Sequence, residues 1–138
     1  MKTYRNGKWG FTIALPNGWR EPSWLFRVLL RRRKQREQPE FYGPYHSKLK
    51  FSVGPIHPIP EVVEQQKNLE RMALKYGHRI TDFYVIRVNG KDHATMAFEA
   101  SGIGEVKTYS LIFGHTEYLI TARGRIHEVD SIVKTFRV

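Results

Sequence analysis

The side chains best suited to specific chemistry are a block of positive charges followed directly by aromatic residues. Residues 27–36 contain no acidic side chain and six basic ones: Arg27, Arg31, Arg32, Arg33, Lys34 and Arg36. Phe41, Tyr42 and Tyr45 come next. Basic side chains contact phosphates and aromatic rings stack on unpaired bases, so the combination is typical of single-stranded nucleic-acid binding. We take these nine residues as the candidate partner-binding site.

The same segment allows other interpretations. Its arginines can be solvated at a helix end, while Phe41 and Tyr42 pack a loop onto the body of the protein. Its charge also suits an acidic protein. An anionic membrane surface is a further possible partner, because the apolar side chains of residues 24–30 precede the charges. A sheet needs those same apolar side chains as cover, and this favours a protein partner over a membrane.

Catalytic and metal-binding patterns are missing from the sequence. No two of the six histidines have the helical i, i+4 spacing or the His-x-His strand spacing of common metal sites. No serine lies in a Gly-x-Ser-x-Gly turn. Gly102 and Gly104 match the first half of the Gly-x-Gly-x-x-Gly pattern of dinucleotide-binding proteins. That pattern leads from a strand into a helix, whereas these two glycines connect two expected strands. We therefore expect no metal, no cofactor and no enzymatic activity, although folding could bring Glu99 and Glu117 together.

Composition indicates one domain over residues 1–138. The chain is 41% hydrophobic and 13% aromatic, which is enough for one core. It has no cysteine, no apolar signal-like N-terminus and no apolar run of the roughly 18 residues that span a bilayer. We expect a cytoplasmic protein without a transmembrane segment. Its net charge is +10, and the block at 27–36 supplies six of these charges, leaving 10 − 6 = +4 elsewhere.

The elements that must position these side chains follow from periodicity and turn residues. The dipeptide Asn6-Gly7 predicts an N-terminal hairpin with a strand over 9–15, ended by the turn Pro16-Asn17-Gly18 before Trp19. Helices are expected from Ser23 into the basic block, over 61–76, and over 129–136. Residues 38–46 are expected to form a loop, and 48–53 a strand. Four strands over 83–88, 94–100, 106–113 and 118–123 should form an antiparallel meander.

Within the expected elements, alternation and helical spacing select the buried residues. Phe11, Ile13 and Leu15 should share one strand face. The helix over 61–76 should bury a stripe, and the last helix a second one. The expected stripes are Val62, Leu69, Met72, Ala73 and Tyr76, and then Val129, Ile132, Val133 and Phe136. His93 is expected at a strand end beside the turn Asn89-Gly90.

This order of elements resembles the PsbP-like superfamily. The resemblance is carried by the opening hairpin, the Pro16-Asn17-Gly18-Trp19 turn, the Val88-Asn89-Gly90 turn in the meander, and the final Thr135-Phe136. The superfamily includes the photosystem II extrinsic protein, a Ran-binding nuclear import factor and bacterial members of mostly unknown function. It implies an α+β fold, in which an α/β/α sandwich has a central antiparallel sheet with an N-terminal hairpin, a C-terminal meander and flanking helices.

The resemblance also implies a non-enzymatic module that binds another macromolecule. Some bacterial relatives serve as chaperones or adaptors that hold hydrophobic helices of secreted effectors. This sequence lacks the signal or lipoprotein segment of exported members, and its basic block is not a family signature. We expect a protein-binding or adaptor module with an unidentified protein partner; the alternative is a nucleic-acid-binding module that uses the basic block and its aromatic neighbours.

Overall fold

The computed structural model describes residues 1–21, 38–124 and 126–138. The helix expected from Ser23 therefore lies outside the described residues. The elements follow in the order β1 (Lys2–Asn6), β2 (Phe11–Leu15), β3 (Glu40–Tyr42), β4 (Lys48–Pro55), α2 (Val62–Lys75), β5 (Arg79–Val88), β6 (Lys91–Ala100), β7 (Gly104–Phe113), β8 (Thr116–Arg123), the 3₁₀ turn η1 (Ile126–Glu128) and α3 (Val129–Val133).

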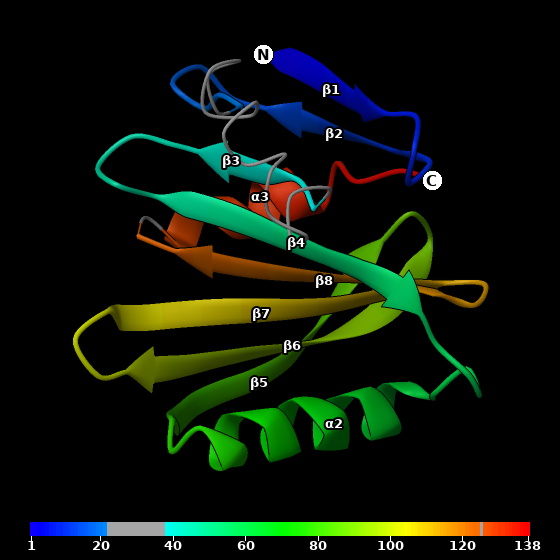
Figure 1. Cartoon of the computed structure of the whole chain (residues 1–138), viewed down its shortest axis with the longest axis vertical. Helices are drawn as coiled ribbons and strands as arrows, with labels where there is room; N and C mark the ends of the chain where they lie inside the picture. The colour runs from blue at the N-terminus through cyan, green and yellow to red at the C-terminus, as the bar shows by residue number, and fades with distance from the viewer. Residues whose placement is uncertain (22–37, 125) are drawn as a thin grey trace, which may run out of the picture.

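A six-stranded antiparallel sheet forms the central layer. Its strand order is β3-β4-β8-β7-β6-β5, so the last four strands along the chain are sequential neighbours. The hairpin β1–β2 forms a separate two-stranded sheet and lies with α3 on one side, while α2 packs on the other (Figure 1). This confirms the predicted α+β sandwich with its N-terminal hairpin, C-terminal meander and flanking helices.

The N-terminal hairpin is tied to the C-terminal residues. Its own turn is fixed by Asn6, whose Oδ1 accepts a hydrogen bond from the Trp9 N–H at 2.8 Å. Thr12 exchanges two backbone hydrogen bonds with Arg137, at 2.8 and 2.9 Å. The Ala14 N–H donates to Thr135 Oγ1 at 2.9 Å. The first strands are thus held in place by a segment more than a hundred residues away.

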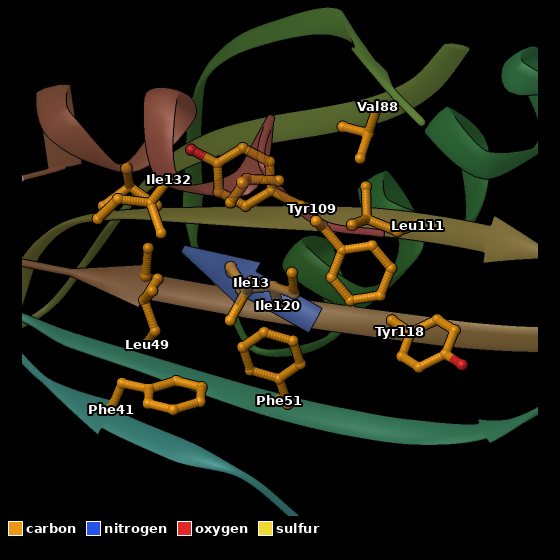
Figure 2. Close-up of a cluster of buried hydrophobic side chains, with 14 of the residues drawn as sticks. Ile13, Phe41, Leu49, Phe51, Val88, Tyr109, Leu111, Tyr118, Ile120 and Ile132 are labelled. Carbon is orange, nitrogen blue, oxygen red and sulfur yellow. The ribbon is translucent and has the colours of Figure 1, made fainter. Parts of the chain in front are cut away.

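The face of the sheet toward α3 carries the larger hydrophobic core. Phe11, Ile13 and Leu15 all point into it, as strand alternation predicts. Figure 2 shows the side chains of β4, β7 and β8 gathered with Ile13 and with Ile132 of α3. The predicted C-terminal stripe is buried here, although α3 ends at Val133 and Phe136 lies beyond it.

On the opposite face, α2 covers β5 and β6 and confirms the predicted second helix. Leu69 and Ala73 are buried against a smaller cluster that includes Met96 and Phe98. The predicted stripe was wrong in one position, because Tyr76 is 65% exposed. Tyr76 is the C-cap residue, where the chain leaves the helical path that the spacing assumed.

The predicted loop over 38–46 was also wrong in part, because it contains the edge strand β3. Glu40, Phe41 and Tyr42 pair with the start of β4. Pro39 and Gly43 flank this strand, so the prolines and glycines that indicated a loop mark only its ends. β5 likewise begins earlier than expected, at Arg79, and has a register shift between Ile80 and Asp82.

Strands β6 and β7 separate beyond the pair formed by Thr95 and Tyr109, and side chains bridge the gap. Gln65 of α2 donates to the Ser110 carbonyl and accepts from the Ala94 N–H, both at 3.1 Å. The Ile112 N–H donates to His93 Nδ1 at 3.1 Å, and Lys91 Nζ donates to the Ile112 carbonyl at 2.8 Å. These bonds satisfy buried backbone groups that a continuous ladder would pair.

His93 must be neutral to fill this role, since its Nδ1 accepts a hydrogen bond. Burial and then the nearby Lys91 charge lower the pKa of His93 to about 4. In the unfolded chain the pKa returns toward 6.5, so the unfolded state binds more protons between these values. The contribution of His93 to stability is complete above pH 6.5 and is lost as the pH falls toward 4.

We therefore expect acid to destabilise the wild type more than a His93→Gln variant. Between pH 7.5 and 4.5 the free energy of unfolding of the wild type should fall by about 2 kcal/mol more than that of the variant. This follows because each unit by which folding lowers the pKa corresponds to about 1.4 kcal/mol. Urea unfolding at the two pH values measures it. A His115→Gln variant is the control, because that side chain is exposed. Equal pH dependence in all three proteins would contradict the assignment.

Candidate functional site

A groove lies on the α2 side of the sheet, beyond the strands that α2 covers. α2 packs over β5 and β6 and does not extend over the same face of β8 and β4; in Figure 1 α2 runs below β5, away from β4 and β8. The groove has a volume of about 290 Å³. Its lining residues come from four strands and two connections: Lys48, Lys50, His78, Phe98, Ala100, Ile103, Val106, Thr121 and Arg123.

The end of α2 positions the wall of the groove. Gly77 adopts a φ of +70°, and the His78 N–H donates back to the Ala73 carbonyl at 3.0 Å, as in a Schellman motif. This turn directs the chain onto β6, where the His78 ring stacks on Phe98 with centroids 4.7 Å apart. Val106 completes an apolar floor, and the exposed Ile103 forms its rim.

Positive charge gathers at the other end of the groove, on β4 and β8. Strand alternation turns Leu49 and Phe51 into the core, so Lys48 and Lys50 face the groove. Lys48 lies directly opposite Arg123 in the strand register, and Lys50 lies opposite Thr121. Like charges opposite each other on neighbouring strands are destabilising. An anion placed between them would remove that cost.

Of the three cations of the groove, only Lys48 has a carboxylate partner among the described residues. Its Nζ lies 3.6 Å from Glu40 Oε1 and 5.6 Å above the Tyr42 ring. The Tyr42 hydroxyl donates to Glu40 Oε2 at 2.9 Å, and burial followed by this bond raises the pKa of Tyr42. Lys50 and Arg123 form no ion pair with any carboxylate in the described part of the chain. Both are exposed.

The structure describes three of the nine predicted partner-binding residues, and these three do not form a common surface. Phe41 is fully buried, packed edge-on against Phe51 with centroids 5.7 Å apart, so its ring is not available for stacking on a base. Tyr42 lies beside Lys48, whereas Tyr45 is 72% exposed on the turn before β4. The six basic residues Arg27, Arg31, Arg32, Arg33, Lys34 and Arg36 lie outside the described residues.

A second polar cluster joins α3 to the sheet. The hydroxyls of Tyr84 and Tyr109 both donate to Asp130 Oδ1, and Lys107 Nζ lies 3.5 Å from the same oxygen. Burial, and then the bond to Asp130, raises the pKa of both tyrosines. Tyrosines with a raised pKa keep their protons and act as hydrogen-bond donors at neutral pH. The cluster therefore ties α3 to β5 and β7.

Glu99 and Glu117, which folding could have brought together, lie apart. Glu99 lies opposite Glu105 in the register and pairs with Arg79, whereas Glu117 lies opposite Ile112, seven residues further along β7. Within residues 1–21, 38–124 and 126–138, no three histidine or acidic side chains are grouped to hold a metal ion. Neither described helix is long and apolar enough to cross a membrane.

Comparison with known proteins identifies the architecture. No protein-family model matches the sequence, and no curated protein matches it. The solution structure of cyanobacterial PsbP (CyanoP) from Synechocystis sp. PCC 6803 aligns with a TM-score of 0.66 over 99% of this chain and 91% of that chain. The fold is PsbP-like. The two sequences are only 10% identical, so the match shows the PsbP-like fold and no particular activity.

Proposed function

We propose that this protein is a non-enzymatic protein-binding or adaptor module, and that its partner docks on the basic half of the sheet, which α2 does not cover. The observation that carries the proposal is the groove, in which an apolar floor adjoins Lys50 and Arg123, two cations that no carboxylate of the described residues neutralises. Binding sites in proteins combine an apolar surface with a few placed polar groups in this way. The partner surface should therefore be acidic.

Two features support a binding role over a catalytic one. Glu99 and Glu117, the carboxylates that folding could have paired, lie apart. The PsbP-like resemblance implies a module that binds another macromolecule, including the adaptor and chaperone roles of some bacterial relatives. A cytoplasmic location and a single domain over residues 1–138 are part of the same proposal and stay predictions.

Affinity capture from a nuclease-treated extract of the source cells tests this function. We expect a specific polypeptide on the immobilised wild type at about 0.15 M salt, reduced at least about tenfold on a Lys50→Glu/Arg123→Glu variant. A Lys2→Glu/Lys67→Glu variant changes the net charge by the same amount at exposed sites on β1 and α2, and should retain the partner. Undiminished capture by the groove variant would contradict the proposal.

The same experiment tests the alternative of nucleic-acid binding. A module that uses the basic block at 27–36 would capture material that nuclease removes and that salt releases steeply. The Lys50→Glu/Arg123→Glu variant would then bind nearly as well as the wild type, because its basic block is unchanged.

A further inference from the structure

We infer that the groove recognises a short polypeptide segment in which one large apolar side chain lies next to acidic residues. The apolar side chain would lie on Phe98 and Val106, and a carboxylate between Lys50 and Arg123. This inference rests on the proposed function and specifies the chemistry of the partner. Three observations carry it: the size of the groove, the separation of its apolar and cationic ends, and the like charges of its cations, of which only Lys48 has a carboxylate partner in the described part of the chain.

The size limits what can enter. At about 290 Å³, the groove is at the lower limit of small-molecule pockets, so it has room for one large side chain and its neighbour. A whole α-helix is about 10 Å across and cannot enter it. Buried aromatic anchors in pockets of this kind commonly dominate protein interfaces.

The separation of the two ends sets the spacing of the partner's side chains. The cations lie on β4 and β8, and the apolar floor lies on β7 and β6. Neighbouring strands are about 4.8 Å apart, so β4 and β6 are roughly 14 Å apart across three steps. Side chains two residues apart on one extended segment point to the same side and start about 7 Å apart, so a tryptophan and a glutamate at this spacing can reach both ends through their own lengths. A free phosphate would use the cations alone, and a plain apolar side chain would leave them unpaired.

The charges favour a carboxylate over other groups. Lys48 and Arg123 face each other in the register, yet within the described residues Glu40 compensates only Lys48. A carboxylate beside Arg123 and Lys50 would make charge-assisted hydrogen bonds with both.

Fluorescence anisotropy with a labelled decapeptide tests the inference. The probe has one tryptophan followed by two glutamates in a glycine-serine background, measured at about 0.15 M salt. We expect binding that weakens at least about tenfold when serine replaces the tryptophan or glutamine replaces both glutamates. Ile103→Ser in the protein, at an exposed rim position, should weaken it as well.

Charge exchange provides the sharper result. The Lys50→Glu/Arg123→Glu variant should lose the probe and bind one with lysines in place of its glutamates better than the wild type does. The Lys2→Glu/Lys67→Glu variant should keep wild-type affinity within about threefold.

Thermal unfolding of each variant shows whether it is folded. Arg123→Glu should not lower the midpoint, because it replaces a like-charge pair with Lys48 by an opposite-charge pair.

Three results would overturn the inference. The first is equal affinity for the probes with and without tryptophan. The second is an equal loss of affinity in the Lys50→Glu/Arg123→Glu and Lys2→Glu/Lys67→Glu variants. The third is displacement of the probe by inorganic phosphate when the tryptophan contributes nothing to its affinity. If the probe does not bind, yet capture of the cellular partner still depends on Lys50 and Arg123, the proposed function stands and this anchor chemistry is wrong. If that dependence is also missing, both fail.

Discussion

A Phe136→Ala substitution should lower the free energy of unfolding by about 3–5 kcal/mol, the usual cost of deleting a buried phenylalanine. The side chain has no exposed surface, and its ring lies 5.1 Å from Phe11 and 4.9 Å from Tyr118 by centroid. Phe113 and Phe51 lie near it as well. Alanine would leave a cavity among rings from four elements, which cannot all move inward together.

Urea and thermal unfolding measure this loss, which corresponds to a midpoint lower by roughly 10–20 °C for a chain of this size. Val138→Ala is the matched control, because that side chain is 54% exposed two residues further along. It should change the free energy of unfolding by less than about 0.5 kcal/mol. A Phe136→Ala protein within about 1 kcal/mol of the wild type would show that Phe136 is not part of a close-packed core.

The second large effect is expected at Gly124, directly after β8. Its φ is +90°, and a Cβ there would lie 2.6 Å from the Cα of Ser47. Gly124→Ala thus combines backbone strain with a collision against main chain, which a rotamer change cannot relieve. Together they should cost about 2–5 kcal/mol, taking about 1–2 kcal/mol for the left-handed conformation and about 1–3 for the overpacking.

Gly114→Ala separates the two contributions. Gly114 also has a positive φ, +61°, but beyond its chain neighbours no atom of the described residues lies within 4 Å of the place that a Cβ would occupy. Its substitution should therefore cost only the conformational part, about 1–2 kcal/mol. Similar losses at both positions, measured by urea unfolding, would show that β8 and the start of β4 can move apart at Ser47 without penalty.

Local signals in the sequence predicted most of the fold. The Asn6-Gly7 and Asn89-Gly90 turns predicted both hairpins, and alternation placed Phe11, Ile13 and Leu15 on one face. These signals succeed because turn conformation and strand alternation depend on neighbouring residues alone. The edge strand β3 was missed since three residues between Pro39 and Gly43 have no alternation long enough to outweigh those two breakers.

The groove could not be predicted in the same way. Lys48 and Lys50 have a visible signal, namely their alternation with Leu49 and Phe51, but it indicates only an outward face. They become part of a site through two long-range features. The strand register sets Lys48 opposite Arg123, 75 residues later, and the end of α2 brings His78 onto Phe98. Gln65 was missed for the same reason. Its amide fills a gap between β6 and β7 that no local pattern shows.

The pairing of Thr12 with Arg137 has a consequence for synthesis of the chain. The hairpin β1–β2 leaves the ribosome before the elements that follow it in this sequence, but its inner face is completed only by Phe136 and the residues around it. Contacts between residues so far apart in the sequence form late in folding, because closing the long intervening chain costs entropy before the contacts stabilise the fold. The nascent protein must therefore carry Phe11, Ile13 and Leu15 unburied until its last strands and helix emerge. A chaperone that binds apolar strands would find its target in these first fifteen residues.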